Sequence, residues 1–399
     1  MKRCVLARWS QHFFRFLPLG GAGYGSDVKM DVRKTAVRRH RRRVAPMLGA
    51  MLLLPFGGRV ARFRRPSLPP EPLPAAPFLD LHCHVAGLGA GGSGCFVSEQ
   101  LRRSWKVGFY FRSFGVSRRE LEQQGDALCA DRLSTMLGRS RHVGRAVALA
   151  LDGAVDDRGN LDTARTEFYI PNEFVAALAK RHTNLLFGAS VNPYRPNALA
   201  RLDQAATDRA VLIKWLPSIQ LIDPADARLA PFYRRMAQLR LPLLTHTGAE
   251  HSFTWSRDEF ADPARLRLPL SLGVTVIAAH AAWPGRHDGE RDVDRLASLM
   301  RDYPNLYADI SSLTQINKLG ALREVLRRPE FRGRLLYGTD FPLINMPIVS
   351  PWFFPLDLSL RQRWQISRIK NPWDRDVALK QALGVPADVF TRAENLLRL

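Results

Sequence analysis

The chain of 399 residues is 46% hydrophobic and 24% charged, which is typical of a globular protein large enough for one α/β domain or two smaller ones. Its net charge of +22 is concentrated at the start, because residues 1–76 hold 16 Lys and Arg against three acids. The remaining residues show no stripe of basic and aromatic side chains, so composition argues against a nucleic-acid partner. Four scattered cysteines argue against a disulfide framework.

The first 76 residues are predicted to be a targeting extension, separate from the folded domain. A basic run at 38–43 precedes an apolar run at 44–57, and a proline-rich stretch follows at 66–77. The apolar run is shorter than the ~20 residues that cross a bilayer as a helix, but it fits a signal peptide or a short anchor. Residues 38–60 are therefore expected to bring the protein to the cell membrane or to export it to the envelope. The alternative is a cytoplasmic protein with a disordered basic extension, because the arginines just beyond the apolar run oppose translocation.

From residue 77 onward, short apolar runs alternate with amphipathic stretches, which is the pattern of parallel βα units. Eight runs are predicted to be strands: 78–82, 145–151, 185–191, 210–216, 241–246, 274–280, 305–310 and 334–339. The stretches 172–182 and 229–240 are predicted to be helices, because their apolar residues recur every three or four positions. This pattern favours a closed (β/α)8 barrel, called a TIM barrel, over residues 77–399. An open doubly wound sheet is the alternative, but no glycine-rich phosphate fingerprint follows the first strand.

Residue types that bind metals stand at the carboxyl ends of these predicted strands, the end at which barrel enzymes carry their chemistry. His82 and His84 lie two residues apart on the first strand, so they point to the same face. Further residues of this kind follow on later strands: Lys214, His246, His280 and Asp340. Each alone is more often a hydrogen-bonded core residue or a helix cap. Together they are expected to converge on the barrel axis and to form a site for a divalent metal.

The segments "DLHCH", "PLLTHTGAE", "VIAAHAAWPG" and "LLYGTDFP" together resemble the amidohydrolase-related branch of the amidohydrolase superfamily, whose members are metal-dependent barrel enzymes. The resemblance extends over about residues 77–399. It implies a single-metal site with the ligands His82, His84, His246 and Asp340. If two ions bind, it implies that Lys214 and His280 are additional ligands, with Lys214 carboxylated and bridging the ions.

The resemblance also implies a chemistry. Imidazole and carboxylate ligands suit zinc, with manganese or iron as alternatives. A bound ion lowers the pKa of a coordinated water to about 7, and Asp340 is expected to accept the proton of that water. His280 is expected either to polarise a substrate carbonyl or to bind a second ion. If Lys214 stays a free ammonium, it attracts an acidic substrate or pairs with a neighbouring carboxylate.

Loop residues near the strand ends are predicted to contact a small-molecule substrate. Arg195 follows the third strand, and Glu250 and His251 follow the fifth. Three roles are open for the segment "RRSWKVGFYFRS" at 102–113: a lid over an anionic aromatic substrate, a membrane-facing patch or an ordinary packing element. The apolar stretch 341–356 after the eighth strand suits a hydrophobic wall beside the metal.

The expected function is hydrolysis of an amide, ester or lactone of a small organic substrate by metal-activated water. The alternative within the same branch is metal-assisted, non-oxidative decarboxylation of an aromatic acid. A third hypothesis is a non-catalytic, membrane-tethered binding barrel, against which the full set of ligand-type residues argues. The expected partners are therefore a small molecule and a membrane surface that binds the N-terminal segment, with a homo-oligomer left open.

Overall fold

The computed structural model describes residue 73 and residues 77–250 and 252–399. Within these residues, eight parallel strands form one sheet in the order β1-β3-β5-β6-β7-β8-β11-β12, so each strand pairs with the strand of this sheet that follows it in the sequence. Their bounds are β1 Phe78–His84, β3 Val143–Leu149, β5 Leu185–Ala189, β6 Leu212–Trp215, β7 Leu243–Thr245, β8 Val276–Ala278, β11 Leu306–Asp309 and β12 Leu335–Leu336. All eight predicted strands are therefore present.

The last strand region returns to the first and closes the ring. The backbone N–H of Leu81 donates to the carbonyl of Tyr337 at 3.3 Å, and that of Asp340 donates to the carbonyl of His82 at 2.8 Å. A parallel bridge also joins Cys83 to Phe341. The predicted TIM barrel is confirmed, and the open doubly wound sheet is excluded.

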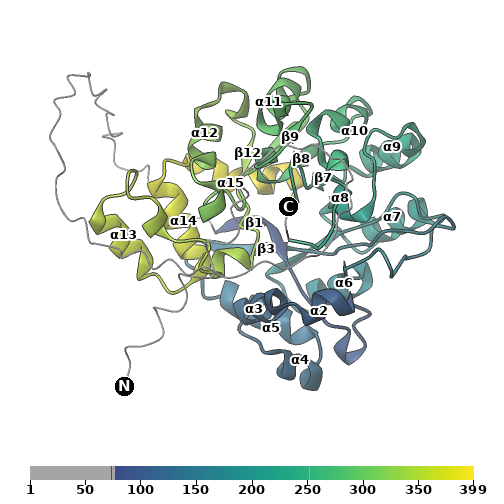
Figure 1. The fold of residues 1–399 in the computed structure, drawn as a ribbon, viewed down its shortest axis with the longest axis horizontal. Helices are drawn as coiled ribbons and strands as arrows, with labels where there is room; N and C mark the ends of the chain where they lie inside the picture. Colours follow the sequence, from purple (N-terminus) through teal and green to yellow (C-terminus); the bar gives the residue numbers. More distant parts are fainter. Residues whose placement is uncertain (1–72, 74–76, 251) are drawn as a thin grey trace, which may run out of the picture. The chain divides into compact units, whose positions relative to one another are not determined.

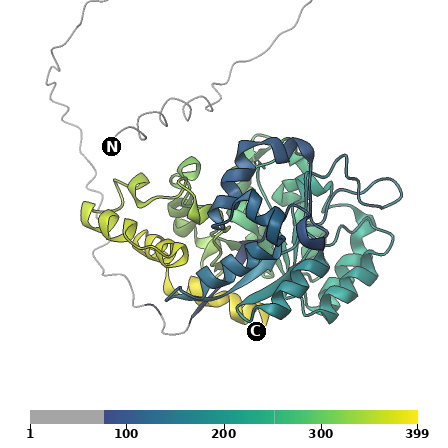
Figure 2. The same cartoon turned by 90° about the horizontal axis from the view of Figure 1, so that it is seen from below.

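Helices follow the strands and surround them in the views of Figures 1 and 2. Their bounds are α2 Glu99–Arg103, α3 Trp105–Ser113, α4 Arg118–Gln124, α5 Ala127–Leu137, α6 Asn172–Arg181, α7 Ala198–Thr207, α8 Pro217–Gln220, α9 Ala230–Leu239, α10 Arg267–Ser271, α11 Asp292–Asp302, α12 Ala321–Arg327, α13 Leu360–Ser367, α14 Pro372–Ala382 and α15 Ala387–Leu397. The predicted helices at 172–182 and 229–240 correspond to α6 and α9. Each buries the apolar side chains that define its periodicity, among them Val175 in α6 and Met236 in α9. Short antiparallel pairs join β2 Phe96–Val97 to β4 Phe168–Tyr169, and β9 Arg286–His287 to β10 Glu290–Arg291.

The predicted strand 274–280 is shorter than expected, because β8 ends at Ala278. His280 and Ala281 have positive φ angles of 57° and 47°, which lie in the left-handed region and cannot continue a strand. The apolar periodicity of this segment does not reveal that turn.

Asp80 fixes the junction between the first and last strands. Its buried carboxylate accepts hydrogen bonds from the backbone N–H of Thr339 at 3.0 Å, the hydroxyl of Thr339 at 2.5 Å and the indole N–H of Trp373 at 2.9 Å. Gly338 allows the close approach, because a Cβ there would lie 2.9 Å from the Cβ of His82. The segments "DLHCH" and "LLYGTD" are thus held side by side by their own residues.

Apolar side chains fill the barrel between its strands, and α15 closes this interior with Ala393 and Leu397. The strand residues of this cluster are Leu79, Leu81, Val147, Leu149, Leu212, Leu244, Ile277 and Leu336. A second, larger core packs the strands against the surrounding helices. The polar residues at the strand ends therefore lie on strands whose apolar side chains are packed in the barrel interior.

Across the described ranges, no helix combines the length and apolar character needed to cross a bilayer. The predicted targeting segment at 38–60 lies outside these ranges, as do the other residues of 1–76 except residue 73. Its membrane role stays a prediction.

Candidate metal centre

The strand-end residues predicted to bind metal lie together around one carboxylate, that of Asp340. The Nε2 atom of His84 lies 3.1 Å from Asp340 Oδ1, and that of His82 lies 3.7 Å from the same oxygen. The Nε2 atom of His280 lies 3.9 Å from Asp340 Oδ2. His82, His84 and Asp340 each offer one ligand atom, and these three atoms lie within 4.8 Å of one another.

His246 lies beside this group, with its ring centroid 5.2 Å from that of His280. Its Nε2 atom is buried and has no hydrogen-bond partner, and the nearest carboxylate oxygen, on Glu250, is 3.6 Å away. A buried polar atom without a partner costs free energy in the fold. The residues present thus fit a divalent cation, which His82, His84, His246 and Asp340 would hold.

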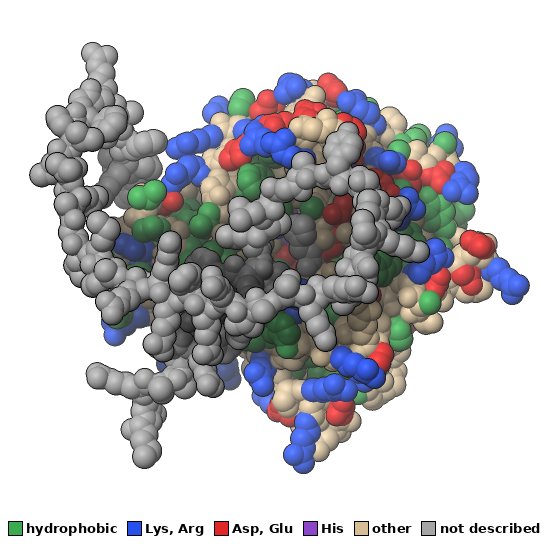
Figure 3. Space-filling view, viewed as in Figure 1, with side chains coloured by type: hydrophobic (Ala, Val, Ile, Leu, Met, Phe, Trp, Pro, Cys, Tyr) green, Lys and Arg blue, Asp and Glu red, His purple; other side chains and the backbone are tan. Residues whose placement is uncertain are grey.

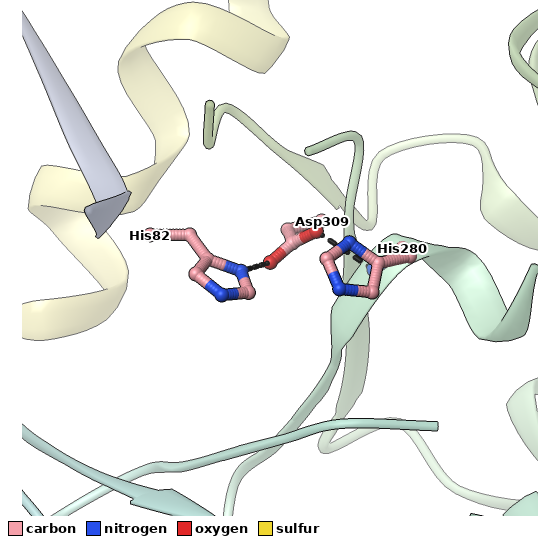
Figure 4. Close-up of side chains that lie close together, drawn as sticks. All are labelled: His82, His280 and Asp309. Atoms are coloured by element: carbon pink, nitrogen blue, oxygen red, sulfur yellow. Dashed lines mark hydrogen bonds and ion pairs between the residues drawn. The ribbon is translucent and has the colours of Figure 1, made fainter. Parts of the chain in front are cut away.

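Asp309 is a central residue of the site that the sequence interpretation missed. It ends β11, and its Oδ2 accepts a hydrogen bond from His82 Nδ1 at 2.8 Å (Figure 4). Its Oδ1 accepts from the backbone N–H of His280 at 2.9 Å. A carboxylate on Nδ1 fixes the tautomer of an imidazole and leaves Nε2 free to bind a metal. A signal was present, because the predicted strand 305–310 carries this aspartate at its carboxyl end.

Ser311 orients His280 in a similar way. Its hydroxyl donates to Asp309 Oδ1 at 2.5 Å, and its oxygen lies 2.9 Å from His280 Nδ1. Because the hydroxyl proton points to Asp309, the oxygen can accept the Nδ1 proton of His280. The Nε2 lone pair of His280 then points toward the site. This arrangement favours an ion-binding role for His280 over polarisation of a carbonyl by an N–H group.

The backbone is strained at two site residues. Asp340 has a φ angle of 60° and His280 one of 57°, in the left-handed region that residues other than glycine rarely occupy. Such conformations cost free energy and cluster at functional sites. The β-strand ends of this chain thus turn sharply where the two side chains enter the site.

Two buried lysines face the site. Lys214 on β6 places its Nζ atom 3.0 Å from Nε2 of His82, and burial lowers its pKa from 10.5 to about 8. Lys318 donates to the hydroxyl of Ser312 at 3.2 Å, and burial lowers its pKa as well. Within residues 77–250 and 252–399, neither lysine has a carboxylate within ion-pair distance. Lys214 was predicted, whereas Lys318, at the end of the short 3-10 helix Ile316–Lys318, was not.

Burial also sets the protonation of the ligands. It lowers the pKa of His82 to about 4, with a further contribution from the Lys214 charge, and it lowers that of His280 well below its usual value. Burial alone would raise the pKa of Asp340, but the hydrogen bond with His84 and the other imidazoles hold it well below 3.8. Neutral imidazoles and an ionised carboxylate are the forms that bind metals.

Arg195, predicted to contact substrate, is held by Asp152. Its Nε and Nη2 atoms donate to the two oxygens of that buried carboxylate at 2.8 and 2.6 Å. Among the described residues, no hydrogen bond or ion pair joins Arg195 to the site histidines. Of the other two loop candidates, Glu250 lies beside His246, and His251 is outside the described residues.

The two apolar segments expected near the site are only partly buried. In 102–113, Phe111 is buried, while Trp105 is 72% exposed. In 341–356, Phe341 stacks on Trp373 at a centroid distance of 4.6 Å. The expected hydrophobic wall is wrong for the end of that segment, because Leu356 is 93% exposed.

The closed barrel, with imidazole and carboxylate ligands at the carboxyl ends of its strands, has the architecture of a metal-dependent barrel enzyme. The family model described as Amidohydrolase (Amidohydro_2) matches residues 137–383. The chain belongs to this amidohydrolase family, whose members are metal-dependent enzymes. The predicted family is confirmed.

Several solved structures are similar to the chain. An uncharacterised TIM-barrel protein from Bordetella bronchiseptica has 17% identity and a TM-score of 0.48, covering 77% of this chain and 99% of its own. A protein assigned as 2-pyrone-4,6-dicarboxylic acid hydrolase from Pseudomonas putida has 15% identity and a TM-score of 0.46, covering 81% and 97%. A 5-carboxyvanillate decarboxylase from Sphingomonas paucimobilis has 12% identity and a TM-score of 0.46, covering 81% and 99%. No curated protein sequence matches the chain.

Proposed function

We propose that the protein is a metal-dependent hydrolase that uses activated water on an amide, ester or lactone of a small organic molecule. The observation that carries this proposal is the convergence of His82, His84 and Asp340, whose ligand atoms lie within 4.8 Å of one another at the mouth of the barrel. The donor set suits zinc, with manganese or iron as alternatives.

The residues of the site have different roles in this reaction. A bound divalent ion would supply Lewis-acid chemistry, polarising a substrate carbonyl and lowering the pKa of water. The Asp340 carboxylate, held 3.1 Å from His84 Nε2, accepts a proton from the attacking water. Asp309 holds His82 in one tautomer through its 2.8 Å hydrogen bond. The buried lysines Lys214 and Lys318 favour an anionic substrate.

A second candidate is metal-assisted, non-oxidative decarboxylation of an aromatic acid. The observation that favours it is the pair of buried ammonium groups, Lys214 and Lys318, because a substrate carboxylate would give each of them an anionic partner. Burying an unpaired charge is costly, so a ligand that neutralises it gains affinity. Release of carbon dioxide distinguishes this reaction from hydrolysis.

Elemental analysis of the purified protein, followed by turnover assays on lactones, esters, amides and aromatic acids, tests both candidates. On the accepted substrate, Asp340→Asn is expected to lower kcat by roughly 10²–10⁴-fold, because an amide cannot take the proton of water. Asp157→Asn, at an exposed loop position, is the matched control and should retain full turnover. Near-native turnover by Asp340→Asn would overturn the role of this carboxylate.

We also propose that residues 38–60 direct the protein to the cell membrane or to the envelope, with a cytoplasmic location as the alternative. The basic run and the apolar run of this segment support the proposal.

A further inference from the structure

Apolar and basic side chains share an exposed surface on the segment after β12, which we call the 352–370 surface. Four large apolar side chains on it are between 41% and 93% exposed: Trp352, Leu356, Leu360 and Trp364. Four basic residues lie on the same segment: Arg361, Arg363, Arg368 and Lys370. Isolated exposed apolar residues are ordinary, but a contiguous group of large ones marks an interaction site.

The two tryptophans and two of the arginines touch one another. The rings of Trp352 and Trp364 meet edge to face with centroids 6.1 Å apart. The guanidinium of Arg363 lies 5.3 Å from the Trp352 ring centroid, and that of Arg368 lies 5.8 Å from the Trp364 ring centroid. The indole rings and the positive charges therefore form one mixed surface.

The segment beneath this surface is well anchored. Ser359 caps α13 with a complete capping box, and Ile366 packs with Phe354, Leu358 and Leu379 in a separate small core. Since α13 already buries an apolar side chain inward, its exposed Trp364 belongs to an outer face that the fold leaves open.

The charge of the surface is positive. The acid within it, Asp357, pairs with Arg323 of α12. In the part of the chain that the structure describes, Arg361 and Lys370 have exposed side chains and no acidic partner. These two cations thus lie on the same segment as the tryptophans without an acidic partner.

The 352–370 surface lies at the edge of the molecule. In Figures 1 and 2, α13 is at the opposite end from α7. Hydrophobic and basic side chains lie beside one another in the left part of Figure 3, where Figure 1 places α13.

We propose that the 352–370 surface docks the protein on the interface of an anionic phospholipid membrane. Tryptophan prefers the headgroup region of a bilayer, and arginine and lysine are attracted to anionic lipids. A second copy of this chain fits less well, because a symmetric contact would bring the unpaired cations of both copies together. This inference does not depend on the proposed reaction.

A site-specific probe tests the proposal on the full chain, in a Cys4→Ser background. A polarity-sensitive fluorophore is attached to Leu356→Cys or, as a matched control, to Leu199→Cys, an exposed leucine of α7. We expect vesicles of phosphatidylcholine and phosphatidylglycerol to blue-shift the probe at position 356 and leave the probe at 199 unchanged. Vesicles of phosphatidylcholine alone should give a much smaller shift.

A charge substitution supplies the second measurement. Arg361→Gln combined with Lys370→Gln should lower partitioning into the anionic vesicles by about 25-fold, or roughly fivefold per cation. Arg209→Gln combined with Arg234→Gln removes the same charge at exposed sites near α7 and α9, and should have a much smaller effect. Equal losses in both variants would overturn the proposal. Two further results would also overturn it. The first is that the protein binds vesicles while the fluorescence of the probe at position 356 stays unshifted. The second is that the shift appears without vesicles and increases with protein concentration, which would indicate self-association.

Discussion

The ammonium group of Lys214 lies 3.0 Å from Nε2 of His82, the nitrogen that His82 would offer to a metal. The other ring nitrogen of His82 is held by Asp309 at 2.8 Å, so the imidazole cannot turn away without losing that hydrogen bond. The charge of Lys214 therefore affects the binding of a cation at His82. As an ammonium it opposes a second ion, whereas a carboxylated Lys214 would supply a bridging anion.

Replacing Lys214 by methionine should stabilise the metal-free protein at neutral pH. Burial lowers the Lys214 pKa from 10.5 to about 8, so between these values the unfolded chain binds more protons than the folded one. The wild-type free energy of unfolding therefore rises with pH over this window, and the cost of the buried charge is complete below pH 8. Relative to wild type, Lys214→Met should gain at most about 3 kcal/mol at pH 7, and this gain should vanish near pH 10.5.

Urea unfolding of chelator-treated protein at pH 7, 8.5 and 10 checks this expectation. Lys106→Met, at an exposed position of α3, is the control and should differ from wild type equally at each pH. A pH-independent difference for Lys214→Met would show that the lysine is not a buried ammonium.

Metal retention should depend on Asp309 although this residue need not be a ligand. Asp309→Asn keeps the shape of the side chain but weakens the hold on the His82 tautomer, so metal affinity should fall roughly 10–100-fold. His82→Ala combined with His84→Ala should remove the metal. Elemental analysis and chelator competition measure both effects, with His142→Gln outside the site as control. Full metal content in the double variant would show that the site is misassigned.

The sequence predicted the parts of the site that local patterns encode. His82, His84, His246 and Asp340 follow apolar runs, and the carboxyl ends of neighbouring parallel strands always meet. Asp309 stands at the carboxyl end of a predicted strand as well, so the same local pattern could have included it, whereas its hydrogen bond to His82, 227 residues away in the chain, is visible only in the fold. Lys318 stands at no predicted strand end, so no local pattern marked it. Hydropathy alone also cannot separate a buried wall from an exposed apolar surface, which explains why the expectation at 341–356 is wrong at Leu356 although Phe341 is buried.

Arg195 should matter for stability more than for substrate affinity. Its side chain is 11% exposed, and it pairs with the carboxylate of Asp152, which is almost fully buried. Arg195→Met would leave that carboxylate unpaired, so the free energy of unfolding should fall by about 3–5 kcal/mol. Adding Asp152→Asn should recover part of the loss. Urea unfolding and KM are the readouts; an unchanged stability with a raised KM would restore the predicted substrate role.

The last prediction concerns residues 1–76. The first strand of the barrel begins at Phe78, whose backbone N–H donates to the carbonyl of His142 at 2.6 Å, and of the described residues before it Leu73 packs against the core. A chain beginning at Pro77 should therefore fold, remain active and lose stable membrane association, because it lacks the apolar run at 44–57. Any association left to the 352–370 surface should be released by high salt, since screening weakens attraction between basic side chains and anionic lipids. Fractionation of cells expressing the full and shortened chains checks this. Equal distribution would show that residues 1–76 are not an anchor, and a shortened chain that fails to fold would place them in the domain.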